Sequence, residues 1–393
     1  MKINKNCVRA FVKSNLGDDL FLYVLCNRYP KEEFVVCSFL KFRKSVSDIP
    51  NLHYISIDQL VIKWIFRVLY LGSILLNRVF QIINGKTVFR KITCFDMYSA
   101  LCKENILISG SLFIENKKSK NSDDKSEIGK NHYQKSEEIY YSRNPYVLGC
   151  NFGPYYTEEY RERYQKLFEK AKQVSFRDSY SSALFCGNNI SWSPDILFTY
   201  PKDKCEKPDI RDYVLISVLD PGKDLQGNSM LTREYVNFMI KLVNRLTIAS
   251  EKIVLMGFCI EQGDDKICSR IYDSVDEKQN VSVINYPTIH YNQAVGYLAN
   301  AKYVIATRYH AMILGWLYEK NVYPIVYNEK MKHVIDDISD QIVYSNIDDL
   351  NDDVIDVILQ SVNKSDFSLQ TEIRDAIQKS EKHFEKLDEL FKR

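Results

Sequence analysis

The chain has 393 residues, too many for one ordinary hydrophobic core, so its length predicts two domains of about 150 to 200 residues each. Hydrophobic residues make up 45% and charged residues 26% of it, a globular balance that excludes a disordered or fibrous protein. The formal net charge is +2, and basic residues form no aromatic-interleaved stripe outside residues 59–91. Nucleic acid is therefore not an expected partner.

The cysteines and residues 1–19 are the features of the sequence that predict the cellular compartment. Ten cysteines are scattered along the chain without a C-x-x-C pair. Several of them, such as Cys37, lie in apolar runs typical of buried strands, which predicts reduced thiols in the core. Residues 1–19 lack the succession of charged, apolar and small residues that marks a secretory signal. We therefore expect a cytoplasmic protein.

Short apolar runs rich in β-branched and aromatic residues alternate with amphipathic helical stretches. This alternation predicts parallel sheets joined by crossover helices, an α/β fold of two doubly wound, Rossmann-like domains. The predicted strands of the first half lie at 8–12, 34–38, 105–110, 145–150 and 173–176. Those of the second half lie at 213–219, 252–258, 281–284, 302–307 and 322–327.

A polar, proline-containing stretch at 199–212 separates the two series of strands and is interpreted as the linker. It divides the chain into a first domain at 1–200 and a second domain at 201–365. The amphipathic tail at 366–393 is predicted to form a helix that packs back across the first domain.

Residues 59–91 are apolar, with six basic residues and no acidic one. The longest uncharged run, between Arg67 and Arg78, is far shorter than the roughly 20 residues that a membrane span requires. A basic amphipathic helix of this kind suits the headgroup layer of anionic lipid, as a peripheral contact at the inner face of the plasma membrane. A pair of core-facing helices with a solvated basic edge explains the pattern equally well, so both interpretations stay open.

Residues 115–138 contain almost no apolar side chain. Such a segment cannot offset its ordering entropy by burial, which predicts a mobile surface insertion. Because the segment follows a glycine turn, a lid over the cleft is the alternative.

Three turns of the first half place glycine and small polar residues directly after a predicted strand. In the first, at 15–20, Gly17 would let backbone amides approach a ligand, while a plain helix cap explains the turn equally well. In open α/β sheets such turns line the ligand crevice at the carboxyl ends of the strands. Together they predict a cleft formed by Asn15, Gly17, Asp18, Gly110, Ser111, Asn151 and Gly153.

The sharpest candidate site is VIATRYHAMILGWLYEK at 304–320, where an apolar strand ends and a helix begins. A helix N-terminus offers free amides and a positive dipole, and the fork of Arg308 beside it suits a carboxylate or a phosphate. His310 adds an imidazole to this predicted anion site. Alternatively, Arg308 is a surface ion-pair residue and His310 a core histidine.

Other candidates also follow predicted strands. Arg177, in QVSFRDSYSSALF, occupies the equivalent strand-to-helix position in the first half. Pairing with an acid is the simpler explanation for Arg177 alone, and Asp178 is a candidate helix cap. The second half contributes Gly263, Asp264, Tyr327 and Lys330.

No metal site is predicted, because the six histidines lack H-x-x-x-H pairing with carboxylates or thiols at ligand spacing. The sequence also contains neither a Walker A motif nor G-x-S-x-G, and no cofactor is expected.

Taken in order, these short motifs resemble those of the polysaccharide pyruvyl transferase family. The match runs from residue 15 to residue 330 and comprises N-x-G-D, G-x-x-F-G-P, F-R-D, S-P-D, E-x-G-D, R-Y-H-A and Y-x-x-K. The resemblance implies a GT-B-like architecture, in which the two domains face each other across a cleft, with the acceptor on the first domain and the donor on the second.

The resemblance also implies a transferase that uses phosphoenolpyruvate as co-substrate. Such enzymes join C2 of this donor to two hydroxyls of one hexose, commonly as a 4,6-ketal. The acceptor would be a hexose-containing glycan of a bacterial surface or capsular polysaccharide, with its repeat unit carried on a lipid such as undecaprenyl diphosphate. The basic segment at 59–91 would help the enzyme to reach this lipid.

Phosphoenolpyruvate carries a carboxylate and a phosphate on one small frame, so Arg177 and Arg308 would clamp it from the two domains. His310 would be the general acid/base, because an imidazole titrates near neutral pH and adjacent anions would raise its pKa. Lys330 would stabilise the departing phosphate, and the other donor-binding candidates are Tyr327, Gly263 and Asp264. The residues that would bind acceptor hydroxyls or accept a proton are Asp195, Asp264 and Glu261.

Two alternatives remain at this point. A nucleotide-sugar glycosyltransferase of the same architecture would also place an anion site at helix termini of the second domain, and fold resemblance alone does not separate the two. A non-catalytic scaffold at a membrane surface that keeps a glycan-binding cleft is the other alternative. The pairing of F-R-D with R-Y-H-A favours pyruvyl transfer.

Overall fold

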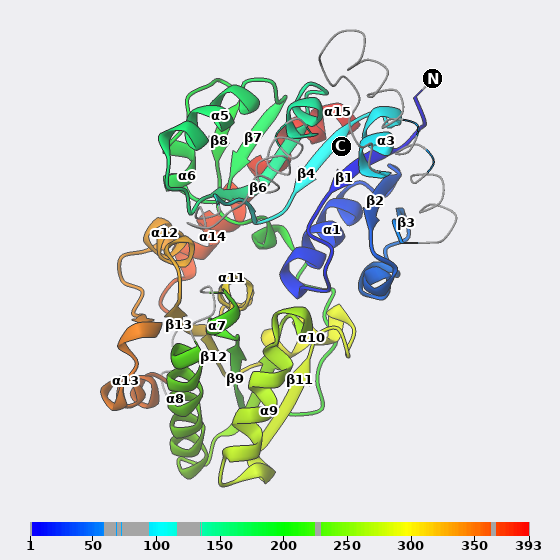
Figure 1. Cartoon of the computed structure of the whole chain (residues 1–393). Coiled ribbons are helices and arrows are strands. Elements are labelled where there is room, and N and C mark those ends of the chain that lie inside the picture. The colour runs from blue at the N-terminus through cyan, green and yellow to red at the C-terminus, as the bar shows by residue number, and fades with distance from the viewer. Residues whose placement is uncertain are drawn as a thin grey trace.

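The structure of the chain is a computed structural model, which describes residues 2–58, 94–115, 136–224, 229–362 and 367–392 and the single positions 68, 72 and 134. The described residues form two domains, each with a parallel sheet and helices around it (Figure 1). The predicted α/β class with two doubly wound domains is therefore confirmed. The helices predicted at 59–91 and most of the loop predicted at 115–138 lie outside the described residues.

The first domain is built on an eight-stranded sheet of order β3-β2-β1-β4-β6-β7-β8, with β5 paired to β6. All of these strand pairs are parallel. The strands are β1 (Asn6–Arg9), β2 (Phe34–Ser38), β3 (Leu52–Ser56), β4 (Asn105–Ile108), β5 (Ser111–Phe113), β6 (Tyr146–Phe152), β7 (Gln173–Phe176) and β8 (Ile190–Trp192). The sequence prediction lacks β3, β5 and β8, because these strands are short and only partly buried.

The first strand ends earlier than the sequence predicts. The apolar run at 8–12 was expected to be a strand, but β1 ends at Arg9. Ser14, in the left-handed region with a φ of 52°, turns the chain toward the first helix. The amide of Leu16 then donates to the carbonyl of Phe258 in the second domain at 3.1 Å. The chain leaves the sheet early because this connection reaches across to the other domain.

The second domain is built on a six-stranded parallel sheet of order β11-β10-β9-β12-β13-β14. Its strands are β9 (Tyr213–Val218), β10 (Lys252–Gly257), β11 (Val281–Asn285), β12 (Tyr303–Ala306), β13 (Asn321–Val326) and β14 (Ser345–Asn346). Each predicted strand of the second half coincides with one of these. The stretch at 199–212 lies between the last strand of the first sheet and the first strand of the second.

Helices connect the strands of both sheets. In the first domain they are α1 (Leu16–Arg28), η1 (Leu40–Val46), α3 (Cys94–Leu101), α5 (Glu158–Phe168), α6 (Ser179–Ala183) and η2 (Ile196–Thr199). In the second they are α7 (Pro221–Asp224), α8 (Ser229–Ile248), η3 (Ile260–Gln262), α9 (Asp264–Ser274), η4 (Lys278–Asn280), α10 (Tyr291–Ala299), α11 (Tyr309–Leu317), α12 (Glu329–Ile338), η5 (Ile347–Asp349) and α13 (Asp352–Val362).

The strand order reverses between β1 and β4 in the first sheet and between β9 and β12 in the second. Open α/β sheets bind ligands beyond the carboxyl ends of the strands at such a reversal. The residues that follow β4 and β12 line one and the same cavity. The topology of both sheets therefore directs their strand ends to a common site.

The C-terminal tail forms α14 (Gln370–Ser380), η6 (Glu381–Phe384) and α15 (Glu385–Phe391). It follows the second domain in sequence but contacts the first. Arg28 of α1 donates to both carboxylate oxygens of Asp388, at 2.9 and 2.5 Å. His383 is wholly buried against strand β7. The red helices of Figure 1 accordingly lie along the first domain.

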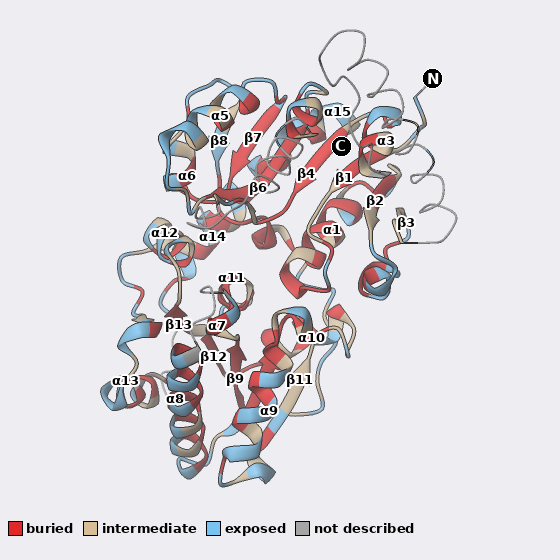
Figure 2. Cartoon of the chain, in the orientation of Figure 1, coloured by how far each residue is buried: buried red, intermediate tan, exposed pale blue. Residues whose placement is uncertain are grey.

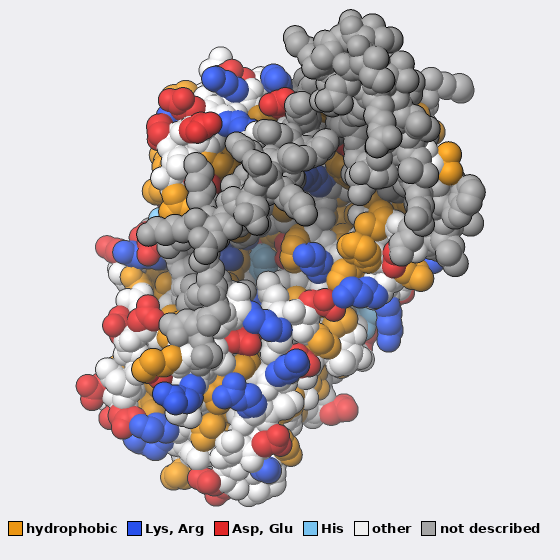
Figure 3. Space-filling model, in the orientation of Figure 1, with side chains coloured by type: hydrophobic (Ala, Val, Ile, Leu, Met, Phe, Trp, Pro, Cys, Tyr) orange, Lys and Arg blue, Asp and Glu red, His pale blue; other side chains and the backbone are white. Residues whose placement is uncertain are grey.

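The strands of both sheets are the most buried part of the molecule (Figure 2). One hydrophobic cluster contains side chains of both domains, such as Phe21 of α1, Leu197 of η2 and Met312 of α11, so the domains pack directly on each other. Charged side chains of both signs cover the face of the second domain that Figure 3 shows. No helix among the described residues is long and apolar enough to cross a membrane.

Candidate active site

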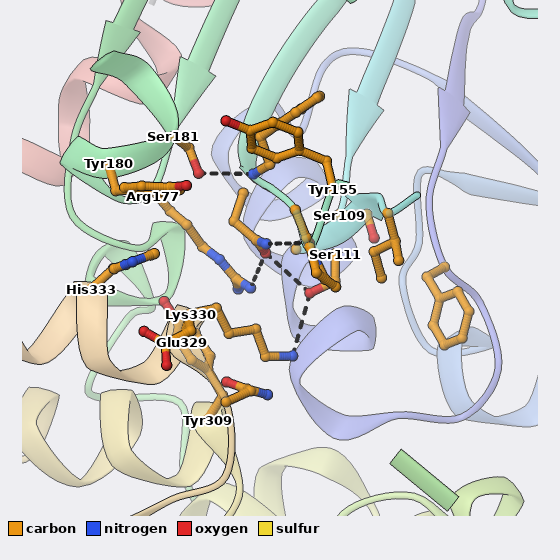
Figure 4. Close-up of a pocket in the computed structure, with 18 of the residues that line it drawn as sticks. Ser109, Ser111, Tyr155, Arg177, Tyr180, Ser181, Tyr309, Glu329, Lys330 and His333 are labelled. Carbon is orange, nitrogen blue, oxygen red and sulfur yellow. Dashed lines mark hydrogen bonds between the residues drawn. The ribbon is translucent and has the colours of Figure 1, made fainter. Parts of the chain in front are cut away.

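A cavity of about 1130 Å³ lies between the two domains. Its first-domain wall consists of the start of α1 and the residues that follow β4, β6 and β7. Its second-domain wall consists of the starts of α11 and α12, with Phe258 and Gln262 after β10. Figure 4 shows Arg177 and Lys330 pointing into it from opposite domains.

Arg177 is a buried cation held by three partners. Its side chain is only 2% exposed, and it donates to Asp195 at 3.1 Å and to Asn151 at 2.7 Å. The guanidinium carbon also lies 4.1 Å from the centre of the Tyr309 ring. Burial lowers the pKa of this guanidinium, but Tyr309 and the carboxylate of Asp195 raise it overall. Arg177 is thus a permanent positive charge at the cavity, as a buried paired arginine is expected to be.

Arg308 is the second buried arginine, at the N-cap of α11, and is 6% exposed. Its guanidinium forms an ion pair with Asp264, with Nε donating at 2.9 Å. Nη1 donates to Gln262 at 2.7 Å, and the backbone amide donates to the hydroxyl of Ser217 at 3.1 Å. These contacts fix the guanidinium group beside the first turn of α11, where the helix dipole favours anions.

His310 lies in the first turn of α11 and faces Arg177. Nη1 of Arg177 lies 3.4 Å from Nε2 of His310, so the arginine donates to a neutral imidazole. Burial, followed by the charges of Arg177, Lys330 and Arg308, lowers the pKa of His310 well below its usual value. The expected rise in this pKa is therefore wrong for the free enzyme, because the ring is buried and the charges that act on it are those of cations.

Two glycines make room for these side chains. A Cβ on Gly17 would lie 1.7 Å from Nδ1 of His310, and a Cβ on Gly110 would lie 2.6 Å from Nη1 of Arg177. Both positions therefore need glycine because a catalytic candidate packs against the backbone there. The sequence predicted that Gly17 lets backbone amides approach a ligand. In the structure the group that approaches Gly17 is the imidazole.

Asp18 and Lys330 complete the charged part of the cavity. Burial raises the pKa of Asp18 to about 6, although Arg177, Lys330 and a backbone hydrogen bond from Gly110 oppose this. The ammonium of Lys330 donates to the hydroxyl of Ser111 at 3.4 Å. A carboxyl group with a pKa of about 6 beside two cations suits proton transfer.

The structure brings most of the predicted site residues together. Those that line the cavity are Asn15, Asp18, Gly110, Ser111, Asn151, Gly153, Arg177, Arg308, His310, Tyr327 and Lys330. Asp195 and Asp264 lie behind it and hold the two arginines. Gly263 caps α9 outside the cavity lining, and Glu261 pairs with Lys41 at the surface.

The sequence did not single out several cavity residues. Tyr309, inside the R-Y-H-A motif, donates to Asp195 at 3.1 Å and so links the second domain to the Arg177 pair. Gln262, inside E-x-G-D, accepts from Arg308. Tyr155, Tyr180 and His333 line the more open part of the cavity. Tyr309 and Gln262 lay inside quoted motifs. Nothing in the local sequence, however, signals that a particular tyrosine or histidine faces a cleft.

Among the residues that the structure describes, no group of three or more His, Cys, Asp or Glu side chains could hold a metal ion. The described lining of the cavity instead includes two arginines, one lysine, two histidines and three carboxylates. Such a set binds an anion and moves protons.

Solved structures similar to this chain share its fold at low sequence identity. A crystal structure of Anabaena HepE in complex with UDP and glucose has a TM-score of 0.57 and 11% identity, covering 99% of each chain. A putative UDP-N-acetylglucosamine 2-epimerase from Listeria monocytogenes has a TM-score of 0.56 and 9% identity, covering 100% of this chain and 97% of that chain. The UDP-GlcNAc 2-epimerase of Methanocaldococcus jannaschii has a TM-score of 0.53 and 7% identity, covering 99% and 100%.

These similarities establish the fold, which is of the GT-B type. No curated protein shows significant similarity to the chain. The family model for polysaccharide pyruvyl transferases matches residues 15–329, which include most of the cavity lining and both arginines. The chain thus belongs to the polysaccharide pyruvyl transferase family and is a transferase enzyme.

Proposed function

We propose that the enzyme transfers the pyruvate moiety of phosphoenolpyruvate to two hydroxyls of one hexose, as a 4,6-ketal, in a surface or capsular polysaccharide repeat unit. The observation that carries the proposal is the convergence of Arg177, Arg308, Lys330 and His310 on one cavity between the domains. A small donor with a carboxylate and a phosphate needs cations on two sides.

The donor would lie between the two arginines. Arg177 comes from the first domain and Arg308 from the second, and each is oriented by a buried carboxylate behind it. Because these partners fix the guanidinium planes before binding, little side-chain entropy is lost when an anion arrives. Lys330 belongs to the second domain but reaches Ser111 of the first, which suits a charge that follows the leaving phosphate.

The chemistry requires a proton on C3 and the loss of two hydroxyl protons. Protonation of C3 makes C2 electrophilic, and the first sugar hydroxyl adds to C2 and gives up its proton. The bond between C2 and the phosphate oxygen breaks, the second hydroxyl adds, and its proton leaves with the phosphate. One hydroxyl proton thus replaces the proton given to C3, so the products are the ketal and phosphate.

His310 and Asp18 are suited to these proton transfers. The imidazole is neutral in the free enzyme, and the charges of a bound donor would raise its pKa and let it protonate C3. Asp18, whose pKa is about 6, would accept the proton of the acceptor hydroxyl. Asp195, Asp264 and Glu261 are less suited to this role, because they already pair with Arg177, Arg308 and Lys41.

Ligand-induced thermal shift tests the donor. Phosphoenolpyruvate should raise the Tm of the wild-type protein, and Lys330→Ala should weaken its binding about tenfold, since a charge-assisted contact is lost without unpairing a buried carboxylate. Lys332→Ala is the matched control, because this lysine of the same helix is exposed and lies outside the cavity lining. Arg308→Lys should also weaken binding, whereas Arg308→Ala would leave Asp264 buried and unpaired.

Transfer itself is tested by mass spectrometry and phosphate release. Incubation with phosphoenolpyruvate and a panel of galactosyl and N-acetylmannosaminyl acceptors, free and lipid-linked, should give a pyruvate ketal and one phosphate per product. A Tm shift with UDP and none with phosphoenolpyruvate, together with no ketal on any acceptor, would contradict the proposal and favour a nucleotide-sugar glycosyltransferase.

A further inference from the structure

The cavity has two chemically different ends. Its inner end contains Arg177 and Arg308, which are 2% and 6% exposed. Its outer end contains Tyr155, Tyr156, Tyr180 and His333, hereafter the tyrosine wall, of which Tyr156 and Tyr180 are 49% and 42% exposed. The volume of about 1130 Å³ exceeds the roughly 300 to 1,000 Å³ of pockets for drug-sized ligands. Phosphoenolpyruvate is far smaller, so the outer end is available to another ligand.

The tyrosine wall is held by both domains. The ring of Tyr180 in α6 stacks on that of His333 in α12, with ring centres 4.1 Å apart and planes at 23°. The neighbouring amide of Ser179 donates to Asp337 of α12 at 2.8 Å. Figure 4 shows Tyr180 and His333 on one side of the pocket. Closure of the domains therefore assembles this part of the cavity as well as the charged part.

The loop that carries two of the tyrosines is fixed before any ligand binds. The carboxylate of Glu115 accepts hydrogen bonds from the amides of Tyr156 and Thr157, at 2.5 and 2.8 Å, and from the hydroxyl of Thr157 at 2.6 Å. The ring of Tyr155 packs on Phe152, with ring centres 5.3 Å apart. Such preorganisation lowers the entropy cost of binding.

The carboxylates of Glu158 and Glu329 line the cavity together with the wall. Burial, Tyr155, and the carboxylates of Asp178 and Glu329 raise the pKa of the Tyr180 hydroxyl. Carboxylates beside the wall disfavour a phosphate or a diphosphate there. Partly exposed tyrosine rings offer apolar faces and polar edges, which match the C–H face and the hydroxyl edges of an uncharged pyranose.

We infer that the tyrosine wall binds a second, uncharged sugar residue of the acceptor, next to the hexose that receives the pyruvate. This inference rests on the proposed function and adds the place at which the neighbouring sugar of the repeat unit binds. The charged end would hold the donor and the reacting hexose. The wall would then discriminate between a glycan and a single sugar.

The test compares three forms of one hexose that the wild-type enzyme accepts: its methyl glycoside, a disaccharide methyl glycoside with that hexose at the non-reducing end, and its UDP derivative. The disaccharide should be used about tenfold better than the monosaccharide in kcat/KM, since one ring-stacking contact is worth about this factor. Tyr180→Phe should keep this preference and Tyr180→Ala should lose it, while the KM for phosphoenolpyruvate stays unchanged in both variants.

Trp192→Ala is the control, because Trp192 is an aromatic residue of the same domain that is 38% exposed and lies outside the cavity lining. Tyr156→Ala provides a second test if Tyr180→Ala fails to fold. Equal use of monosaccharide and disaccharide by the wild type, a preference for the UDP derivative, or equal losses on both sugars in Tyr180→Ala would overturn the inference and leave the donor chemistry intact. No ketal on any acceptor would instead count against the proposed function.

Discussion

At the scale of single residues, the candidate catalytic groups depend on what lies behind them. His310 occupies its position because Gly17 has no side chain, and Arg177 lies against Gly110 for the same reason. Burial, together with the cations around His310, lowers its pKa, so the free enzyme holds a neutral imidazole that accepts from Arg177. The residue type therefore decides which chemical group is present, and the neighbouring residues decide its protonation state.

Gly17→Ala tests this dependence on space. The added Cβ would lie 1.7 Å from Nδ1 of His310, so the imidazole must move. We expect kcat to fall about a hundredfold, because displacement of a catalytic group by about 1 Å costs this much. The Tm should change little, since His310 is partly exposed to the cavity and has room to shift. Steady-state kinetics and a thermal melt provide the two measurements.

Gly110→Ala serves as the comparison. Its Cβ would crowd Arg177 instead of His310, so we expect weaker binding of phosphoenolpyruvate and a smaller effect on kcat. A Gly17→Ala enzyme with the wild-type kcat would show that the position of His310 does not matter for the reaction.

At the scale of elements, the C-terminal tail supports the site from behind. In η6, Nε2 of the His383 imidazole donates to the carbonyl of Pro194 at 2.8 Å, and the Ser175 hydroxyl donates to Nδ1 at 2.6 Å. Burial lowers the pKa of His383 to about 4, so the ring is neutral and suits both contacts. Pro194 immediately precedes Asp195, which holds Arg177. A segment that follows the second domain thus supports a candidate donor-binding residue of the first.

His383→Ala should weaken both the fold and the donor site. The change leaves the carbonyl of Pro194 and the hydroxyl of Ser175 buried without this partner, which costs about 1 to 3 kcal/mol per group. We expect a lower Tm and a higher KM for phosphoenolpyruvate, measured at a temperature at which the variant stays folded. Lys386→Ala, an exposed position of the same tail, is the control. A lower Tm with an unchanged KM would mean that the tail stabilises the domain without positioning Arg177.

At the scale of the whole molecule, the two domains are joined by buried polar contacts as well as by the shared hydrophobic cluster. The hydroxyl of Tyr286 in the second domain donates to the carboxylate of Asp19 in α1 at 2.8 Å. Burial raises the pKa of Asp19 to about 7, although Tyr286 and Ser45 oppose this. Asp19 directly follows Asp18, so the domain contact and the cavity belong to the same helical turn.

The raised pKa of Asp19 makes the stability of the molecule depend on pH. The folded protein holds a proton on Asp19 up to about pH 7, whereas the unfolded chain releases it near the ordinary value of 3.8. The contribution is therefore fully present below about pH 4 and is lost as the pH rises toward 7. Asp19→Asn, which mimics the protonated form, should melt with the wild type at pH 4 and above it at pH 8.

Thermal melts of both proteins from pH 4 to 8 measure this difference, and subtraction removes distant groups that titrate in both, such as His383. Asp348→Asn, at an exposed position, is the matched control. A difference in Tm that does not change with pH would show that Asp19 stays ionised in the folded protein.

The sequence by itself determined the α/β class, the strands β9 to β13 of the second sheet and the turns that carry Arg177, Arg308 and His310. It could do so because these features are local: an apolar run marks a buried strand, and a polar residue after it marks the start of a helix. It did not predict β3, β5 and β8, because their partly buried residues give no continuous apolar run.

Only the tertiary structure decided how the site residues are used. Asp195 and Asp264 were expected to contact substrate. In the structure they instead form ion pairs with Arg177 and Arg308, behind the cavity. The neutral state of His310, the role of Gly17 and the tyrosine wall all depend on contacts between residues more than a hundred positions apart. Such contacts follow from strand order and from the packing of one domain on the other, which no local pattern of residues encodes.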